Sequence, residues 1–220
     1  MEKTKVCIFD LDGTLLNTLP AIAYFCNTAL AHFGLSTFPE DRFRYFAGNG
    51  AKNLVKNMLD AQGADTEALF EPVYTYYNEI YNANPTKNTA PYPEIPALLA
   101  TLQEKGIALA VLSNKPHYAV CETVKGFFPD IAFSVVQGQT EALPLKPSPE
   151  GIFRILSAVG AKREECLYSG DSDVDMKTAL AAGVFSVGAA WGFRGEKELT
   201  EAGASAVAAN PLALLDWVCG

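Results

Sequence analysis

The feature that most restricts the fold of this chain is a regular alternation of apolar runs and helical patterns after residue 94. Short apolar runs bounded by turn residues predict buried strands at residues 107–112, 131–136, 165–169 and 184–187. Apolar residues at helical spacing predict helices from residue 95 up to Gly106, and at residues 117–127, 149–159 and 174–182. Such alternation is typical of a parallel sheet with helices on both faces. We therefore predict an α/β fold with a Rossmann-like, doubly wound parallel sheet.

The first 95 residues follow a different pattern. The apolar run Val6–Phe9 predicts one more strand, and helical patterns without intervening strands follow at residues 18–33, 50–63 and about 70–81. Pro72 interrupts the third pattern and leaves the start of that helix open. Several prolines at residues 84–96 predict a stiff connector. Because the first strand has no helical partner of its own, we expect it to join the same sheet. We assign the α/β core to residues 1–16 and 86–220, and a small inserted α-helical cap domain to residues 17–85.

Composition limits the class of partner. Of the 220 residues, 49% are apolar and 19% charged, as in ordinary globular proteins, and the net charge of −8 disfavours binding to nucleic acid or anionic membranes. No apolar run approaches the roughly 20 residues of a membrane helix, and residues 1–5 do not fit a signal peptide. The cysteines form no Cys-x-x-Cys pair, which favours free thiols in a reducing cytosol; they are Cys7, Cys26, Cys121, Cys166 and Cys219. We expect a cytoplasmic monomer or homodimer that binds neither nucleic acid nor membrane.

Polar residues follow the predicted strands where the carboxyl ends of those strands would meet. The segments are Asp10-Leu11-Asp12-Gly13-Thr14, Ser113-Asn114-Lys115, Lys146-Pro147 before the helix at 149–159, and Gly170-Asp171-Ser172-Asp173-Val174-Asp175. Open parallel sheets bind ligands at this edge. Carboxylates gathered in one place repel one another unless a cation joins them, and hard oxygen ligands favour Mg²⁺. A divalent cation beside a lysine is suited to holding a phosphoryl group.

Three other ligand motifs do not fit. A calcium loop beginning at Asp171 would need glycine at its sixth position and glutamate at its twelfth, where the chain has Met176 and Ala182. Gly48-Asn49-Gly50 begins like a dinucleotide fingerprint, but Asn53 replaces the third glycine and no clear strand precedes it. The sequence contains no P-loop motif. Each residue of the predicted site is also common in turns or on surfaces, so the functional hypothesis depends on their order and spacing.

That order and spacing resemble the haloacid dehalogenase superfamily of phosphohydrolases. All four motifs of the superfamily occur in order: Asp10-x-Asp12-Gly13-Thr14, Ser113-Asn114, Lys146-Pro147 and Gly170-Asp171-x-x-x-Asp175. The helical block resembles the small α-helical cap of the superfamily. Within it, the chain is similar to the phosphoglycolate phosphatase branch through Ala47-Gly48-Asn49-Gly50-Ala51, Pro91-Tyr92-Pro93 and Trp191-Gly192-Phe193.

The resemblance implies a Mg²⁺-dependent phosphatase that hydrolyses the phosphomonoester of a small metabolite, with 2-phosphoglycolate as the first candidate. It implies that Asp10 is the nucleophile, which forms an aspartyl-phosphate, and that Asp12 is the general acid and base. It further implies that the side chains of Asp10 and Asp171 and the backbone carbonyl of Asp12 bind Mg²⁺. The acid at position 12 favours phosphate esters, because dehalogenases of the superfamily generally lack one there.

Other residues are implied to bind phosphate or substrate. Lys146, which the resemblance also makes a catalytic residue, would hold phosphoryl oxygens together with Ser113 and Asn114. Asp175 would lie behind these groups and orient the metal or Lys146. In the cap, N–H groups of Gly48, Asn49 and Gly50 are candidates to bind a substrate carboxylate. The stripe of Tyr74, Tyr77 and Tyr81 predicts packing within the cap, and Arg194 is a candidate anion contact.

Alternatives to a phosphatase remain open from the sequence alone. The same scaffold also carries sugar-phosphate mutases and inorganic pyrophosphatases, and a non-catalytic metal-binding descendant is a third possibility. A mutase would protect its aspartyl-phosphate from water and need a bisphosphate activator. A non-catalytic descendant is disfavoured because Asp10, Asp12, Lys146 and Asp171 are all present.

Overall fold

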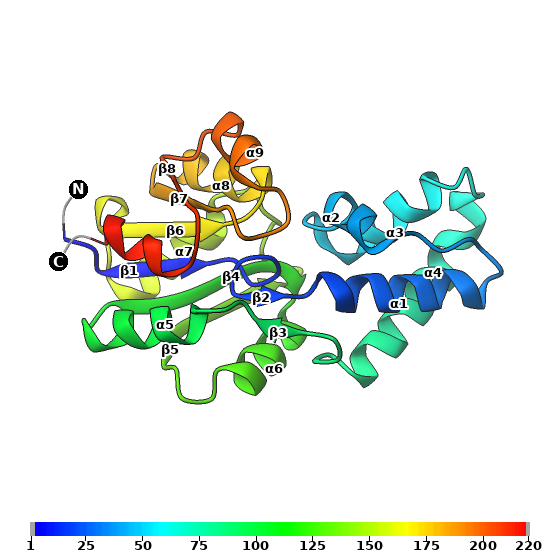
Figure 1. The fold of residues 1–220 in the computed structure, drawn as a ribbon, viewed down its shortest axis with the longest axis horizontal. Helices are drawn as coiled ribbons and strands as arrows, with labels where there is room; N and C mark the ends of the chain where they lie inside the picture. The colour runs from blue at the N-terminus through cyan, green and yellow to red at the C-terminus, as the bar shows by residue number, and fades with distance from the viewer. Residues whose placement is uncertain (1–2, 219–220) are drawn as a thin grey trace.

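The computed structural model describes residues 3–218 and contains a six-stranded parallel sheet (Figure 1). In spatial order its strands are β5 (Phe133–Gln139), β4 (Ala108–Pro116), β1 (Val6–Phe9), β6 (Cys166–Gly170), β7 (Phe185–Ala189) and β8 (Ala206–Ala208). Every neighbouring pair in this sheet is parallel. The α/β architecture predicted from the alternation of patterns is therefore confirmed, although β4 and β5 continue past their predicted ends.

β1 lies in the middle of the sheet, between β4 and β6. Val6 is in register with Ala108 on one side and with Cys166 on the other. All residues of β1 are buried. A strand with neighbours at both edges and helices on both faces needs an apolar side chain at every position, which explains the uninterrupted run. The expectation that the first strand joins the sheet is confirmed.

Helices cover both faces of the sheet. On one face, α5 (Ile95–Glu104) and α6 (His117–Phe127) pack with Cys7 and Phe9 of β1 in one hydrophobic cluster. On the other, α7 (Glu150–Val159) and α8 (Asp173–Ala182) pack with Val6 and Ile8 in a second cluster. Successive side chains of a strand point to opposite faces, so β1 contributes alternately to the two clusters. This is the doubly wound arrangement that the sequence predicts.

A group of helices lies beside one end of the sheet, and we call it the helical cap (Figure 1). It consists of α1 (Leu19–His32), a 3-10 turn (Glu40–Arg42), α2 (Phe43–Phe46), α3 (Gly50–Asp60) and α4 (Thr66–Ala83). Buried side chains of the cap, among them Phe25, Phe43 and Tyr77, form a third hydrophobic cluster, which Ala119 and Phe193 of the α/β part also join. A cluster of its own supports an inserted cap, while the domain boundaries at residues 17 and 85 remain a prediction.

Two short antiparallel strands lie where the chain enters and leaves the cap. They are β2 (Leu16–Asn17) and β3 (Ala90–Pro91), with Leu16 opposite Pro91 and Asn17 opposite Ala90. β3 falls within the segment predicted as a stiff connector. Pro96, counted in that connector, instead lies in the first turn of α5, where the missing N–H of a proline is not needed.

The third helix predicted for the cap corresponds to α4. It begins at Thr66, and the side chain of Asp65 accepts a hydrogen bond from the N–H of Ala68 at 3.1 Å. Pro72 lies inside the helix, so the expectation that it interrupts the start of the helix is wrong. A proline there removes one backbone hydrogen bond, but the same helix buries Val73 and Tyr77 against the rest of the cap, and this packing keeps the helix continuous.

Several short elements have no counterpart in the sequence prediction. They include α2, α9 (Glu196–Glu201), β8 and 3-10 turns at Arg163–Glu165 and Leu212–Trp217. Cys7, Cys26, Cys121 and Cys166 are free thiols, as expected, and Cys219 lies outside the described residues. Within residues 3–218, no helix combines the length and the apolar character needed to cross a membrane.

Candidate active site

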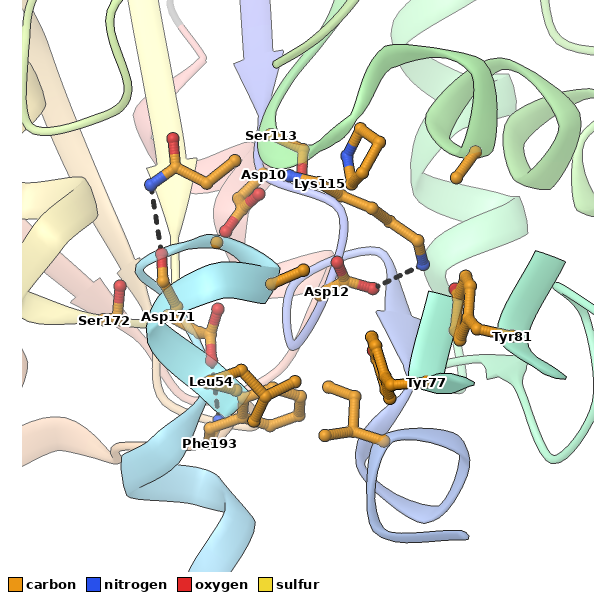
Figure 2. A pocket seen from close by; sticks show the side chains of 18 of the residues that line it. Asp10, Asp12, Leu54, Tyr77, Tyr81, Ser113, Lys115, Asp171, Ser172 and Phe193 are labelled. Atoms are coloured by element: carbon orange, nitrogen blue, oxygen red, sulfur yellow. Dashed lines mark hydrogen bonds and ion pairs between the residues drawn. The ribbon is translucent and has the colours of Figure 1, made fainter. Parts of the chain in front are cut away.

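The carboxyl ends of β1, β4 and β6 open into a pocket whose opposite wall belongs to the helical cap (Figure 2). The chain passes from β1 to β4 on one side, whereas β6 lies on the other side of β1. The chain therefore leaves β1 in opposite directions along the sheet, and open parallel sheets bind ligands in the crevice between strands connected in this way. On the sheet side, the pocket is lined by Asp10, Asp12, Ser113, Lys115 and Asp171. On the cap side, it is lined by Gly48, Gly50, Leu54, Tyr77 and Tyr81.

Asp10 is held at the end of β1 by both its backbone and its side chain. Its N–H donates to the carbonyl of Ser169 at 2.9 Å, which continues the ladder toward β6. Its Oδ1 accepts from the N–H of Leu11 at 2.7 Å, and its Oδ2 lies 3.0 Å from Nζ of Lys146. Burial raises the pKa of Asp10 to about 7, although the nearby ammonium of Lys146 acts in the opposite direction. The carboxyl group is therefore fixed in position and poorly solvated.

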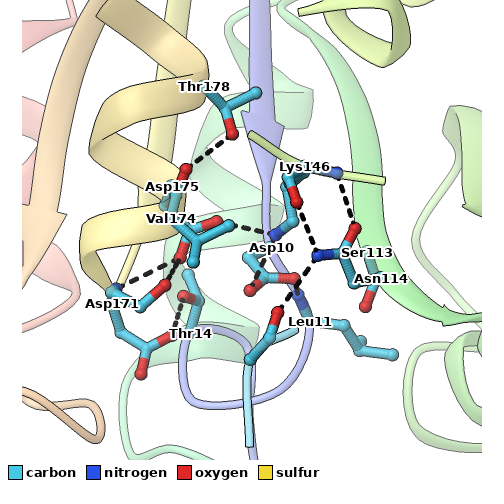
Figure 3. Close-up of polar contacts among 12 residues, drawn as sticks. Asp10, Leu11, Thr14, Ser113, Asn114, Lys146, Asp171, Val174, Asp175 and Thr178 are labelled. Atoms are coloured by element: carbon cyan, nitrogen blue, oxygen red, sulfur yellow. Dashed lines mark hydrogen bonds and ion pairs between the residues drawn. The ribbon is translucent and has the colours of Figure 1, made fainter. Parts of the chain in front are cut away.

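Lys146 and Asp175 form a buried ion pair behind Asp10 (Figure 3). Nζ of Lys146 lies 2.6 Å from Oδ1 of Asp175 and 3.3 Å from the hydroxyl of Tyr168, and the lysine side chain is only 3% exposed. The other oxygen of Asp175 accepts from the N–H and the hydroxyl of Ser172, at 3.1 and 2.6 Å. Burial acts to raise the pKa of Asp175, but Lys146 and these hydrogen bonds lower it below its ordinary value. Asp175 thus contacts Lys146 directly, and its predicted role of orienting the metal or Lys146 remains a prediction.

Asp171 lies at the end of β6, where two other segments meet it. Its Oδ2 accepts from the backbone N–H of Phe193 at 2.8 Å, and its Oδ1 accepts from the hydroxyl of Thr14 at 3.1 Å. Gly13 and Gly192 pack directly against it, and a Cβ atom on either glycine would overlap the side chain of Asp171. Gly13 also has φ of +87°, which side chains other than glycine rarely adopt. Both glycines are therefore needed for Asp171 to occupy this position.

Three buried carboxylates converge at this end of the sheet. Asp10, Asp171 and Asp175 each place one oxygen within 4.8 Å of the others. Burial, followed by the charges of Asp175 and Asp10, raises the pKa of Asp171 well above its ordinary value. A divalent cation relieves such repulsion, and an all-oxygen donor set suits Mg²⁺. The predicted ligands Asp10 and Asp171 belong to this group, whereas the side chain of Asp12 does not.

Asp12 points away from the other carboxylates, toward the cap (Figure 2). Its Oδ1 lies 3.2 Å from Nζ of Lys115, whose side chain is 10% exposed. The ring centroid of Tyr81 lies 5.1 Å from the same Nζ. The sequence motifs predict no role for Lys115. The available signal was its place directly after Ser113 and Asn114 at the end of a predicted strand.

Ser113 and Asn114 occupy the end of β4 in different ways. The hydroxyl of Ser113 lines the pocket and accepts from the N–H of Lys115 at 3.3 Å. The amide of Asn114 accepts from the N–H of Lys146 at 2.8 Å and donates to the carbonyls of Lys146 and Gly48 at 3.2 and 3.1 Å. The side chain of Asn114 therefore holds the loop of Lys146 and the entrance of α3 together.

The wall that the cap contributes is mostly apolar and aromatic. Tyr77 and Tyr81 are buried in the cap cluster, as expected for packing residues, and both also line the pocket. Gly48 and Gly50 line it at the start of α3, whereas Asn49 is not among the lining residues. Arg194 lines the pocket as well.

Arginines join the cap to the loop after β7. The guanidinium of Arg44 donates to the carbonyls of Gly192 and Phe193 at 3.4 and 3.1 Å. From the opposite side, Arg194 donates to the carbonyl of Ala47 at 3.5 Å and lies 3.6 Å from Glu198. The cap is thus anchored to the segment that also holds Asp171.

Comparison with known proteins identifies related enzymes. The profile of the haloacid dehalogenase-like hydrolases matches residues 7–189. The chain is 35% identical over 219 residues to phosphoglycolate phosphatase of Haemophilus influenzae strain 86-028NP, which covers 97% of this chain and 93% of that protein. It is 31% identical over 194 residues to phosphoglycolate phosphatase of Aquifex aeolicus, with 86% of each covered. A crystal structure of a candidate phosphoglycolate phosphatase from Lactobacillus delbrueckii subsp. bulgaricus has a TM-score of 0.92 at 28% identity and covers 99% of both chains.

These similarities extend over the fold and over all four motifs. The matched residues 7–189 include every predicted site residue from Asp10 to Asp175. The sequence-based expectation of a hydrolase related to the phosphoglycolate phosphatases is thereby confirmed. The chain belongs to the haloacid dehalogenase-like hydrolase family.

Proposed function

We propose that this chain is a Mg²⁺-dependent phosphatase that hydrolyses the phosphomonoester of a small metabolite, with 2-phosphoglycolate as the first candidate. The observation that carries the proposal is the arrangement of two carboxyl groups at the end of β1. Asp10 is fixed beside Lys146, and Asp12 projects into the same pocket with its own cation. One group is suited to attack phosphorus, and the other to exchange a proton with the leaving group.

In the proposed reaction, a carboxylate oxygen of Asp10 attacks phosphorus. A bond between this oxygen and phosphorus forms, and the bond from phosphorus to the ester oxygen breaks. Asp12 donates its proton to the departing alkoxide, which leaves as an alcohol. Water then attacks phosphorus of the aspartyl-phosphate while Asp12 takes a proton from it, and inorganic phosphate leaves with Asp10 restored.

The donor set fits Mg²⁺, and we propose that Asp10, Asp171 and the backbone carbonyl of Asp12 hold it. When bound, the ion would supply positive charge next to the phosphoryl oxygens and the attacking carboxylate. Asp175 already accepts hydrogen bonds at both oxygens, so we assign it to positioning Lys146 rather than to the metal.

The phosphoryl group needs further donors. Lys146, 3.0 Å from Asp10, balances negative charge where that group approaches the nucleophile. Ser113 lines the pocket, and we propose its hydroxyl as the next donor. We assign Asn114 to phosphate binding through its backbone N–H, because its side-chain amide is occupied by Lys146 and Gly48.

Substrate choice is the part of the proposal that depends on the cap. The relatives over nearly the full length of the chain are named phosphoglycolate phosphatase, and this makes 2-phosphoglycolate the first candidate. We propose that the segment Gly48–Gly50 takes part in choosing the substrate, since both glycines line the pocket. We further propose that the enzyme acts in the cytoplasm as a monomer or homodimer.

The test is phosphate release from a panel of small phosphate esters and pyrophosphate, compared as kcat/KM with and without Mg²⁺. Asp10→Asn should lower kcat by at least about 1,000-fold, because it removes the nucleophile but keeps its size. Asp130→Asn, an exposed aspartate away from the pocket, is the matched control and should keep wild-type turnover.

Each part of the proposal has its own contrary result. Turnover that survives chelation of divalent ions would exclude the metal. Turnover retained by Asp10→Asn would exclude the covalent role. A preference for pyrophosphate, or a requirement for a bisphosphate activator, would replace the phosphatase with a pyrophosphatase or a mutase.

A further inference from the structure

Lys115 is a largely enclosed cation in the pocket, 10% exposed at its side chain, that the proposed reaction does not use. It projects from the end of β4 toward the cap, and its ammonium lies between Asp12 and the ring of Tyr81 (Figure 2). An ammonium has three hydrogen-bond donors, and Asp12 and Tyr81 are two partners, which leaves donor capacity for a third.

Two other cations lie near the pocket. Lys146 lies between Asp10 and Asp175, at 3.0 and 2.6 Å, and balances the nucleophile from behind. Arg194 lines the pocket, and it contacts Glu198 and the carbonyl of Ala47. Among the described residues that line the pocket, Lys115 is the cation that contacts Asp12, the proposed acid for the leaving group.

The position of Lys115 fits a particular part of a substrate. A general acid must come within about 3 Å of the ester oxygen that it protonates. Since Nζ of Lys115 is 3.2 Å from Asp12, it lies within about 6 Å of that ester oxygen when Asp12 donates. A carboxylate on the carbon next to the ester oxygen extends about 3 Å beyond it, and a hydrogen bond covers the remaining distance of about 3 Å.

The wall of the pocket includes apolar and aromatic side chains, which make an unpaired charge there costly. Leu54, Ile22, Tyr77 and Tyr81 line the pocket, together with the polar residues Asn78 and Tyr118. A carboxylate in such surroundings needs a cation, and a largely enclosed lysine needs an anion. Charge therefore favours an anionic leaving group at Lys115.

We propose that Lys115 is a specificity residue, which binds a carboxylate on the carbon next to the ester oxygen, as in the 2-phosphoglycolate proposed above. This inference rests on the proposed function and deepens it. It assigns recognition of the leaving group to the end of β4, on the sheet side of the pocket, in addition to the cap. Asp12 and Lys115 then act on adjacent atoms of the substrate, the ester oxygen and the neighbouring carboxylate.

The test compares two substrates that differ only in this charge. 2-Phosphoglycolate and its amide have nearly the same size, but the amide is neutral. The wild-type enzyme should prefer the carboxylate by about 10- to 100-fold in kcat/KM, as expected for a charge-assisted hydrogen bond. Lys115→Met should lower turnover of both substrates, since it also removes the partner of Asp12, and should bring the preference ratio to within about threefold of unity.

Two further variants make the result specific. Lys115→Arg keeps the cation and should retain a preference for the carboxylate. Lys52→Met removes an exposed lysine of the cap that lies over the ring of Tyr74, outside the pocket, and should leave the ratio at its wild-type value. If Lys115→Met does not fold, the wild-type ratio itself decides, because equal use of the acid and the amide would overturn the inference.

The outcomes also separate this inference from the proposed function. A ratio unchanged by Lys115→Met, in an enzyme that turns over both esters, would overturn the role of Lys115 and leave the phosphatase intact. Failure of the wild-type protein to release phosphate from either ester, or from any other ester with Mg²⁺, would overturn the proposed function and this inference with it.

Discussion

Replacing Asp175 by asparagine tests the contribution of its buried pair with Lys146 to stability. The substitution keeps the size of the side chain but removes the charge that lies 2.6 Å from Nζ of Lys146. It also turns an acceptor into a partial donor opposite the N–H and hydroxyl of Ser172. Breaking a buried ion pair costs about 3–5 kcal/mol.

Part of that cost is offset, because the negative charge of Asp175 repels Asp10 and Asp171 and raises their pKa values in the metal-free protein. Neutralising Asp175 relieves this repulsion. We therefore expect a net loss of about 3 kcal/mol in the free energy of unfolding at pH 7, or a fall in Tm of roughly 6–12 °C for a chain of this length.

Urea unfolding of the metal-free protein measures this loss directly. Asp173→Asn is a matched control on the same helix, because Asp173 forms a partly exposed pair with Lys177 and should cost less than about 1 kcal/mol. The pKa of Asp175 is lowered by folding, so its contribution is complete above the pKa of the unfolded chain, about 4, and is lost as the pH falls further. The pair of Asp175 with Lys146 thus contributes equally at pH 7 and pH 5. Because Asp10, with a pKa of about 7, gains a proton toward pH 5, the repulsion that the variant relieves becomes smaller. The difference between wild type and Asp175→Asn should therefore be at least as large at pH 5 as at pH 7. Equal losses for the two variants, or a difference that disappears between pH 7 and pH 5, would refute the reasoning.

Three further predictions concern the pocket. Asp12→Ala should lower kcat for alkyl phosphates by about 100- to 10,000-fold. The loss for aryl phosphates should be smaller, because an aryl oxide leaves without a proton. Equal losses of kcat for the two kinds of ester in steady-state assays would contradict acid catalysis by Asp12. Burial raises the pKa of Asp10 to about 7, so protons compete with Mg²⁺ for its carboxylate below that pH. The apparent Kd for Mg²⁺, measured by calorimetry, should therefore rise by up to about tenfold per pH unit below pH 7. A Kd that does not change with pH would exclude Asp10 as a ligand. Gly34 has a positive φ similar to that of Gly13 but open space around it, so Gly34→Ala should cost about 1 kcal/mol. Gly13→Ala should cost more, because the added Cβ would overlap Asp171. Equal losses in urea unfolding would contradict the close packing against Asp171.

The parts of the fold that the sequence predicts are those with a strong periodic or apolar signal. Strands buried on both faces, such as β1, need apolar residues at every position, and this leaves an unmistakable run. The carboxyl ends of such strands share one edge of a sheet, so the meeting of Asp10, Ser113 and Asp171 follows once the strands are placed. Similarly, the cap is visible as consecutive helical patterns without a strand.

The remainder depends on contacts between distant segments. β8 and α9 span only a few residues, too few for a period to emerge. Pro72 suggests a break that the packing of Val73 and Tyr77 overrides. Lys115 was missed because the sequence places it at the end of a strand but does not show that it turns toward Asp12 and Tyr81. Likewise, the amide of Asn114 could not be known to meet both Lys146 and Gly48.

A single peptide group contacts both the helical cap and Asp171. Between Gly192 and Phe193, the N–H donates to Asp171, while the carbonyl of the same group accepts from Arg44 of α2. Swinging the cap outward would withdraw Arg44 and free this peptide to rotate, and the orientation of Asp171 would loosen with it. By thermodynamic reciprocity, an ion that fixes Asp171 would in turn favour the closed position of the cap. Metal occupancy and substrate enclosure would then rise and fall together across two parts of the chain that are separate in sequence.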